Sequence, residues 1–241
     1  MRKKIKVLLL SAGFGTRLRP ITERIPKCLV EINGEKLLLN WLKKLEKIGC
    51  DEVLINTHYL SSQVEEVVKK WKSKNLKCKT IYEKELLGTA GTLRLNSEFF
   101  RNSVGLLIHA DNFTNIDLDD FLKFHYQRKD KSIISMITFK TDYPRECGIV
   151  EVDKDNILID YHEKVENPPT NIANGAIFAF DDSFIDYFLS LPNRYTNFCA
   201  DIVPKLKGRI QTYFTNCFFI DIGTPRSLKL ARELCKENNY G

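Results

Sequence analysis

The sequence has little that would export or anchor the chain, because long hydrophobic runs are missing. Behind the basic start Arg2-Lys3-Lys4, the apolar stretch covers only about six residues. The core of a secretory signal needs at least about seven apolar residues, and a membrane-spanning helix needs about twenty. We therefore expect a cytoplasmic protein without a membrane partner.

The patterns of disulfide frameworks and zinc sites are missing too. The seven cysteines are odd in number and contain no Cys-x-x-Cys pair, and the four histidines are scattered along the chain. A disulfide scaffold or a zinc site would need paired or closely spaced ligands. We expect free thiols and no zinc.

A strong charge of one sign is also absent. The 37 basic and 31 acidic residues leave a net charge of +6, which is spread along the chain. This charge is too weak and dispersed to predict a nucleic-acid partner, although it suits small anionic substrates. The 241 residues, 43% of them hydrophobic, contain no linker or repeat, which predicts a single domain over residues 1–241.

What the sequence does contain is an alternation of apolar runs and amphipathic stretches, which is typical of βαβ units and a mainly parallel sheet. A capping box at Ser62 to Glu65 predicts the start of one helix, and Thr224 before Pro225 predicts the start of the last. Further helices are expected near 183–190 and 199–206. Four strand-like segments with short connections predict an antiparallel or mixed layer at residues 133–139, 148–152, 157–162 and 174–180.

A glycine-rich loop follows the first strand, residues 5–10. Its sequence, Ser-Ala-Gly-Phe-Gly-Thr from Ser11, can present consecutive backbone N–H groups to an anion. Arg17 and Lys27 add positive charge, and Pro26 restricts the backbone just before Lys27. The pattern predicts a phosphate-binding loop, with a turn flanked by two solvated cations as the alternative.

Two better-known phosphate-binding patterns do not fit this loop. A dinucleotide fingerprint needs a third glycine where the chain has Leu18, and a P-loop needs a Gly-Lys-Ser/Thr sequence that does not follow. The missing residues argue against a dinucleotide-dependent oxidoreductase and against a P-loop NTPase.

Two aspartates each close a strongly apolar strand. Asp111 follows residues 106–110, and Asp221 follows residues 218–220. Ligands of open α/β sheets bind at the carboxyl ends of strands, so the two carboxylates are expected to converge. Mg²⁺ is bound by one or two carboxylates together with substrate phosphates, which makes both residues candidate metal ligands; capping of the next segment is the alternative.

Two further positions bear chemistry. Glu163 and Lys164 stand at a strand end, where a carboxylate can accept hydrogen bonds from hydroxyl groups and an ammonium can meet a phosphate; a solvated ion pair is the alternative. Asn174-Gly175 interrupts an apolar strand against β propensity, which predicts a bulge or a functional site.

Together these motifs resemble the nucleotidyltransferases that make nucleotide sugars from a nucleoside triphosphate and a sugar 1-phosphate. The resemblance is carried by residues 12–18 with Pro26-Lys27-x-Leu29, and the later motifs follow in the family's order. It implies a three-layer α/β/α fold with a Rossmann-like mixed, mainly parallel central sheet of the nucleotide-diphospho-sugar transferase type.

The resemblance also implies the role of each site residue. Arg17 and Lys27 would be the catalytic cations, and Asp111 and Asp221 would hold Mg²⁺ as the cofactor. Glu163, Lys164, Asn174 and Gly175 would bind the sugar phosphate. The expected nucleotide-binding residues are Ser11, Ala12, Gly13, Gly15, Thr16, Gly88 and Thr89.

Within the family, the sequence is most similar to guanylyltransferases acting on mannose or heptose 1-phosphate. We therefore expect GTP as the nucleotide and a role in making surface-polysaccharide precursors. A cytidylyltransferase acting on phosphocholine or another phosphorylated polar acceptor is the first alternative. A catalytically silent regulatory paralogue that binds nucleotide sugars is the second alternative. A homo-oligomer is compatible with each of these functions.

Overall fold

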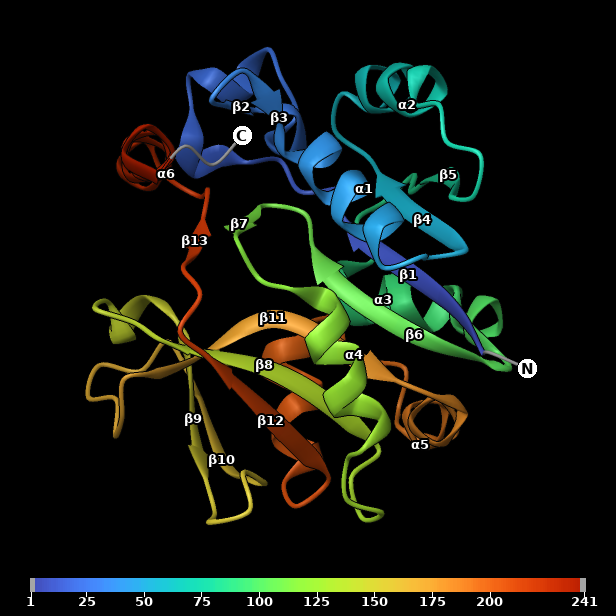
Figure 1. Ribbon diagram of the computed structural model, residues 1–241, viewed down its shortest axis with the longest axis vertical. Coiled ribbons are helices and arrows are strands. Elements are labelled where there is room, and N and C mark those ends of the chain that lie inside the picture. The colour runs from blue at the N-terminus through green and yellow to red at the C-terminus, as the bar shows by residue number, and fades with distance from the viewer. Residues whose placement is uncertain (1–2, 239–241) are drawn as a thin grey trace. The chain divides into compact units, whose positions relative to one another are not determined.

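The computed structural model describes residues 3–238, which divide into two compact units (Figure 1). The first unit comprises Leu87–Ile108, Ile116–Cys217 and the residues up to Lys6, and the second comprises Val7–Leu86, His109–Asn115 and the residues from Phe218. Each unit is therefore assembled from segments far apart in the sequence. A single catalytic domain over residues 1–241 stays a prediction.

The second unit contains the βαβ pattern expected at the start of the chain. Strand β1 (Lys4–Leu10), which belongs to this unit from Val7 on, neighbours β4 (Glu52–Thr57), and β4 pairs in parallel with β5 (Lys77–Tyr82). Helices α1 (Leu37–Lys47) and α2 (Ser61–Lys70) connect these strands. The apolar side chains of α1 are buried at the spacing of a helix face, as expected for one of the amphipathic stretches between the strands.

The capping box predicted for α2 is wrong. The helix begins at Ser61, one residue before the predicted cap, and its cap residue Leu60 has a left-handed backbone with no side-chain hydrogen bond. Ser62 therefore lies inside the first turn, where its hydroxyl cannot serve the cap position. The prediction for the last helix is confirmed, since the Thr224 hydroxyl accepts a hydrogen bond from the N–H of Ser227 at 3.1 Å.

Short elements complete the second unit and surround the glycine-rich loop. The hairpin β2–β3 (Glu31–Ile32, Glu35–Lys36) lies beside helix α6 (Pro225–Asn238), and β7 (Asn112–Thr114) pairs with β13 (Phe219–Asp221). Three 3₁₀ helices cover Thr16–Leu18, Ile21–Glu23 and Lys27–Leu29. One buried apolar cluster joins these elements: Leu18, Val30, Ile32, Leu37, Phe113, Ile220, Ile222, Leu228, Ala231 and Cys235.

The first unit holds the mixed sheet that the sequence predicts after residue 133. Strand β11 (Ile172–Phe180) is its centre and pairs antiparallel with β6, β8 and β9, while β10 pairs antiparallel with β9 and β12 runs parallel to β8 (Figure 1). The other strands are β6 (Ser103–His109), β8 (Ile134–Lys140), β9 (Gly148–Val152), β10 (Leu158–Glu163) and β12 (Ile210–Thr215).

The helices of the first unit are α3 (Gly88–Leu95), α4 (Leu118–Tyr126) and α5 (Asp182–Ser190). The helical segment expected near 199–206 is a π-helical turn, Phe198–Ile202, followed by the 3₁₀ helix Val203–Leu206. Two more 3₁₀ helices cover Ser97–Phe100 and Pro144–Glu146. The mixed α/β fold class predicted from the sequence is confirmed.

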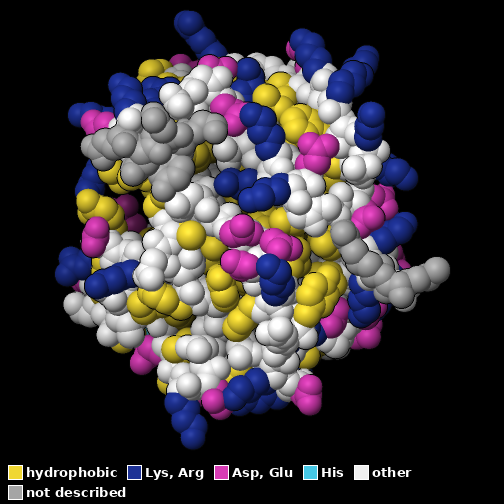
Figure 2. All heavy atoms as spheres, in the orientation of Figure 1, with side chains coloured by type: hydrophobic (Ala, Val, Ile, Leu, Met, Phe, Trp, Pro, Cys, Tyr) yellow, Lys and Arg dark blue, Asp and Glu magenta, His cyan; other side chains and the backbone are white. Residues whose placement is uncertain are grey.

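The surface charges and the character of the helices can be described directly. Lys and Arg side chains are interspersed with acidic and neutral ones on the face shown in Figure 2, without forming one basic patch. No helix within residues 3–238 has both the length and the apolar character needed to cross a membrane.

Candidate functional site

The structure places the predicted site residues in two groups, one in each unit. The phosphate loop, defined as residues 11–16, lies in the second unit together with the Lys27 cluster, defined as Arg17, Lys27, Asp111 and Asp221. The residues predicted for the ribose and the sugar phosphate lie in the first unit: Gly88, Thr89, Glu163, Lys164, Asn174 and Gly175.

Lys27 connects the two strand-end aspartates. Its Nζ lies 2.5 Å from Oδ2 of Asp111 and 2.8 Å from Oδ1 of Asp221. Arg17 approaches the other oxygen of Asp221, with Nη2 and Oδ2 3.5 Å apart. The Lys27 side chain is only 12% exposed, whereas that of Arg17 is 63% exposed. The buried lysine is therefore held in place, while the arginine is open to solvent.

The two aspartates converge for a different reason than the sequence suggests. Strand β13 is not part of the larger sheet; it pairs antiparallel with β7 and sets Asp221 opposite Asn112, the residue next to Asp111. The N–H of Ile222 also donates to the carbonyl of Asp111 at 2.9 Å. Successive side chains of a strand point to opposite faces. Because Ile220 and Ile222 point into the core, the Asp221 carboxylate between them points away from it.

The charges of the cluster stabilise one another. Burial by itself lowers the pKa of Lys27, but the carboxylates of Asp111 and Asp221 outweigh it and raise that pKa above its usual value. Burial likewise raises the pKa of Asp111, but the ammonium of Lys27 outweighs it and the net pKa is lowered. Both groups are therefore charged at neutral pH, and the two carboxylates offer the hard oxygen donors that suit Mg²⁺.

The phosphate loop needs glycine at Gly15. This residue has φ +63°, and a Cβ there would lie 2.9 Å from Cγ2 of Thr22. The hydroxyl of Thr22 in turn donates to the carbonyl of Gly15 at 2.7 Å, and the N–H of Leu18 donates to the same carbonyl at 2.9 Å. The buried Thr22, which the sequence analysis did not select, thus stabilises the turn through its hydroxyl group.

A buried asparagine holds the start of the loop. Asn56, at the end of β4, accepts the N–H of Ser11 through Oδ1 at 2.7 Å, and the Ser11 hydroxyl donates to the Asn56 carbonyl at 2.5 Å. The amide nitrogen of Asn56 donates to Oε1 of Glu83 at 2.9 Å. The N–H of Ser11 is therefore committed to the protein, so that Ser11 shapes the loop from its first residue.

The next N–H groups point to an anion site. Within residues 3–238, the backbone N–H groups of residues 12–16 make no hydrogen bond to another group of the protein. The hypothetical Cβ of Gly13 meets nothing within 4 Å, so that the backbone is open to close approach there. Unpaired N–H groups beside two cations are the arrangement in which proteins bind phosphate.

In the first unit, the turn at Gly88 and Thr89 packs against the π-helical segment Phe198–Ile202. Gly88 has φ +73°, and a Cβ there would overlap the carbonyl oxygen of Thr196. The N–H of Ala90 donates to that carbonyl at 2.8 Å, and the Thr89 hydroxyl accepts from the N–H of Phe198 at 2.7 Å. The conformation of this turn is therefore fixed by residues that lie more than 100 positions away in the chain.

Glu163 and Asn174 come together around a tyrosine. The Tyr161 hydroxyl donates to Oε2 of Glu163 at 2.6 Å, and Nδ2 of Asn174 lies 3.5 Å from the same hydroxyl. Lys164 Nζ lies 3.7 Å from the other Glu163 oxygen. The predicted sugar-phosphate residues are thus neighbours, joined by a residue that sequence reasoning did not select.

The bulge predicted at Asn174-Gly175 is confirmed. The pairing of β11 with β8 slips between Asn174 and Phe178, and Ala176 has φ +53°. The Asn174 side chain stabilises the bulge, because Oδ1 accepts the N–H of Ala176 at 2.8 Å. The same side chain therefore shapes the backbone through its oxygen and reaches Tyr161 through its nitrogen.

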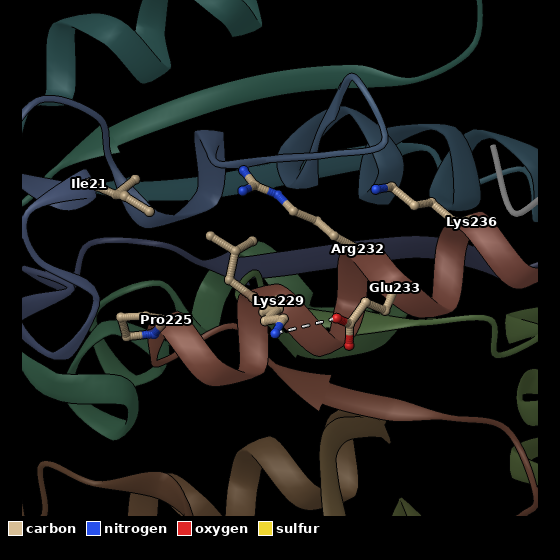
Figure 3. Close-up of a pocket in the computed structure, with 7 residues that line it drawn as sticks. Ile21, Pro225, Lys229, Arg232, Glu233 and Lys236 are labelled. Atoms are coloured by element: carbon tan, nitrogen blue, oxygen red, sulfur yellow. Dashed lines mark ion pairs between the residues drawn. The ribbon is translucent and has the colours of Figure 1, made fainter.

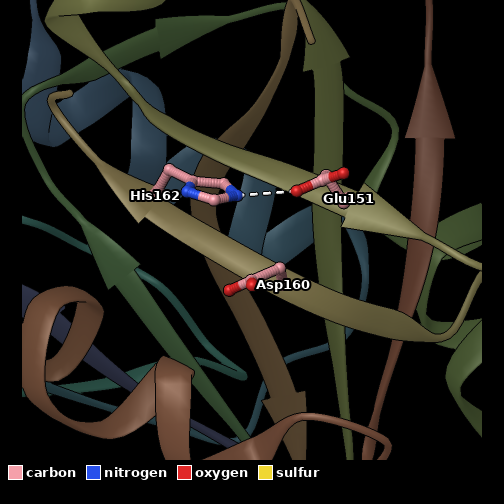
Figure 4. Close-up of side chains that lie close together, drawn as sticks. All are labelled: Glu151, Asp160 and His162. Atoms are coloured by element: carbon pink, nitrogen blue, oxygen red, sulfur yellow. Dashed lines mark hydrogen bonds and ion pairs between the residues drawn. The ribbon is translucent and has the colours of Figure 1, made fainter. Parts of the chain in front are cut away.

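Two other features lie outside these groups. A groove of about 410 Å³ runs along α6 and is lined by Ile21, Leu228 and basic side chains that include Arg232 (Figure 3). On the hairpin β9–β10, His162 Nε2 lies 2.7 Å from Oε1 of Glu151 near Asp160, which is paired with Lys207 (Figure 4). Neither contains a residue predicted for the site.

A comparison with protein families shows which family the chain belongs to. The family model described as nucleotidyl transferase matches residues 6–238. The chain belongs to the nucleotidyl transferase family.

Among the curated proteins, this nucleotidyl transferase is 30% identical over 230 residues to the mannose-1-phosphate guanylyltransferase catalytic subunit beta of Danio rerio. It is 26% identical over 227 residues to a mannose-1-phosphate guanylyltransferase of Mycobacterium tuberculosis (strain ATCC 25618 / H37Rv). Both matches cover 92% of this chain but only 62% of the relative, so the chain spans under two thirds of their length.

Solved structures share the fold. HddC from Yersinia pseudotuberculosis complexed with GMP-PN is 27% identical, with a TM-score of 0.78 and coverage of 95% of this chain and 98% of HddC. A Bacillus anthracis protein assigned as a glucose-1-phosphate thymidylyltransferase is 20% identical, with a TM-score of 0.86 and coverage of 98% and 97%; at this identity it supports the fold alone.

Proposed function

We propose that this protein joins a nucleoside triphosphate to a sugar 1-phosphate and releases pyrophosphate. The observation that carries the proposal is the position of Lys27, whose ammonium lies between Asp111 and Asp221 in the unit that also holds the phosphate loop. Unpaired loop N–H groups and two cations would bind the triphosphate. The acceptor would be bound in the first unit by Glu163, Lys164 and Asn174.

The reaction asks little covalent help of the protein. An oxygen of the sugar phosphate attacks the α-phosphorus, a new O–P bond forms, and the bond from that phosphorus to the β-phosphate oxygen breaks. The nucleophile is already an anion, so no general base is needed. Lys27 and Arg17 would neutralise the phosphate oxygens and align them, which is the main source of catalysis in such transfers.

Asp111 and Asp221 would hold Mg²⁺. Their oxygen-only donor set fits this ion, which commonly takes one or two protein carboxylates and completes its shell with phosphates and water. Bound there, the ion would supply further positive charge to the triphosphate. Lys27 contacts both carboxylates, so its ammonium and the ion would share the same two anions.

We propose GTP and a mannose- or heptose-type sugar phosphate as substrates. The support is the names of two relatives, which are mannose-1-phosphate guanylyltransferases, and the complex of HddC with GMP-PN. A carboxylate beside an ammonium also suits an acceptor that carries both hydroxyl groups and a phosphate.

Pyrophosphate release tests the proposal. GTP, CTP, UTP and dTTP are each combined with mannose 1-phosphate, a heptose 1-phosphate, glucose 1-phosphate and phosphocholine, with Mg²⁺ or with EDTA. We expect the highest kcat/KM with GTP and one of the first two acceptors. With EDTA we expect no pyrophosphate release from any pair. Highest activity with CTP and phosphocholine would replace the substrates, and saturable binding without pyrophosphate release from any pair would favour a silent paralogue.

A further inference from the structure

The carboxylate of Glu163 is held from within the protein by a buried tyrosine. Tyr161 is 7% exposed, and its hydroxyl lies 2.6 Å from Oε2 of Glu163. Both residues lie on β10 two positions apart, so that their side chains share one face of the sheet. A phenol has a single proton to donate, and here that proton goes to Glu163.

The neighbouring strand makes room for this contact. Gly148 on β9 pairs directly with Glu163 on β10. A Cβ at Gly148 would overlap the Tyr161 hydroxyl and would lie 2.8 Å from Oε2 of Glu163. Any other residue at this position would therefore have to displace the tyrosine, the glutamate or both.

On strand β11, the side chain of Asn174 contacts both the tyrosine and the bulge. Asn174 on β11 places Nδ2 3.5 Å from the Tyr161 hydroxyl and 3.4 Å from the Cys199 sulfur, while its oxygen caps the bulge. Burial, together with the nearby Cys199 and Glu163, raises the pKa of Tyr161 well above its usual value. The hydroxyl keeps its proton at any working pH and acts as a permanent donor.

We propose that Tyr161 is a positioning residue that fixes the Glu163 carboxylate for recognition of sugar hydroxyl groups. The tyrosine binds Oε2 from the protein side, while Oε1, which lies 3.7 Å from Lys164 Nζ, remains available to accept from the sugar. A carboxylate of fixed orientation presents its lone pairs in set directions, which favours acceptors with a hydroxyl group at a set distance from the phosphate. The inference rests on the proposed function.

Tyr161→Phe is the central test, because it removes one oxygen atom and keeps the ring in the core. With GTP and mannose 1-phosphate, or the best pair of the panel, we expect KM for the sugar phosphate to rise about tenfold while KM for the nucleotide stays within about twofold. Tyr126→Phe, at an exposed tyrosine of α4 in the same unit, is the matched control and should change neither.

A double-mutant cycle separates positioning from packing. If Tyr161 acts through Glu163, adding Tyr161→Phe to Glu163→Gln should change KM by less than about twofold, because the residue it positions is already altered. Gly148→Ala should raise the same KM, since its Cβ takes the place of the hydroxyl.

The outcomes are distinct. A wild type that turns over no substrate pair contradicts the proposed function and this inference together. An active wild type with an unchanged sugar-phosphate KM in Tyr161→Phe overturns the inference alone. Equal increases in both KM values, or additive effects of the two substitutions, would show that the tyrosine only supports the fold.

Discussion

Lys27 and Asp111 form a short ion pair, with Nζ 2.5 Å from Oδ2, although 84 positions separate them in the sequence. The lysine begins the 3₁₀ helix Lys27–Leu29 directly after Pro26, and the aspartate stands just beyond β6. The same ammonium also contacts Asp221. Lys27 therefore links three distant segments of the second unit, and its own Cβ lies 3.4 Å from the position of a Cβ built at Gly15 of the phosphate loop.

Removing either partner should abolish most of the activity. We expect Lys27→Ala and Asp111→Ala each to lower kcat at least about a hundredfold, the scale for losing one preorganised charge in a phosphoryl-transfer site. Pyrophosphate release measures the rate, and circular dichroism checks the fold. Lys36→Ala, which breaks an exposed ion pair with Glu31, is the control and should stay within about twofold. Folded variants with near wild-type kcat would contradict the assignment.

Gly15 and Gly13 should respond differently to the same change. Gly15→Ala forces a side chain into a left-handed backbone and towards Thr22, so we expect the free energy of unfolding to fall by about 1–2 kcal/mol. Gly13→Ala meets open space and should change it by less than about 0.5 kcal/mol. Urea denaturation measures both. Equal losses at the two positions would show that the turn at Gly15 is not the strained one.

Asn56→Asp should destabilise the protein in a pH-dependent way. The new carboxylate would face Glu83 without the amide hydrogens that now link the two side chains, and Asn56 is only 4% exposed. We expect a loss of at least about 2 kcal/mol at pH 7, with a smaller loss at pH 5, where one carboxyl can be protonated. Urea denaturation at both pH values tests this. Asn33→Asp, at an exposed turn, is the matched control and should be nearly neutral.

His125 should make the protein less stable in acid. Burial, with a smaller contribution from Arg128, lowers the pKa of this histidine to about 3, against the attraction of Asp181 and with a small effect of Lys3. An unfolded chain binds a proton there below about pH 6.5, whereas the folded chain does not until about pH 3, so stability falls as the pH decreases between these values.

Comparison with a variant isolates this contribution. His125→Asn removes the titrating ring, so we expect its free energy of unfolding to depend less steeply on pH between 6 and 4. The difference in slope should be up to about 1.4 kcal/mol per pH unit, the limit for one proton. Parallel pH profiles of wild type and variant would show that His125 is not kept neutral by the fold.

Much of the fold could be predicted because its signals are local. The buried face of α1, the cap of α6 and the bulge at Asn174 each depend on residues within one helical turn or one strand. The cap of α2 could not be predicted, because a serine followed by glutamate at the right spacing does not decide which residue begins the helix when Leu60 takes a left-handed backbone.

The residues that support the site could not be predicted, because their contacts are not local. In the sequence, Thr22 and Asn56 look like ordinary polar residues. No neighbouring residue indicates that the Thr22 hydroxyl binds the Gly15 carbonyl or that the Asn56 side chain binds the N–H of Ser11. Tyr161 reads as one of several aromatic strand residues. Their roles arise from partners on other elements, which no local pattern encodes.

By itself, the sequence determined that this protein alternates strands and helices, that its first loop suits phosphate, and that two aspartates end apolar runs. Only the tertiary structure decided which side chains meet. Asp221 reaches Lys27 across 194 positions because β13 pairs with β7, and Glu163 is oriented because Gly148 leaves room for Tyr161. Periodicity and turn chemistry are written in neighbouring residues, whereas strand register and side-chain contacts exist only once distant segments have packed.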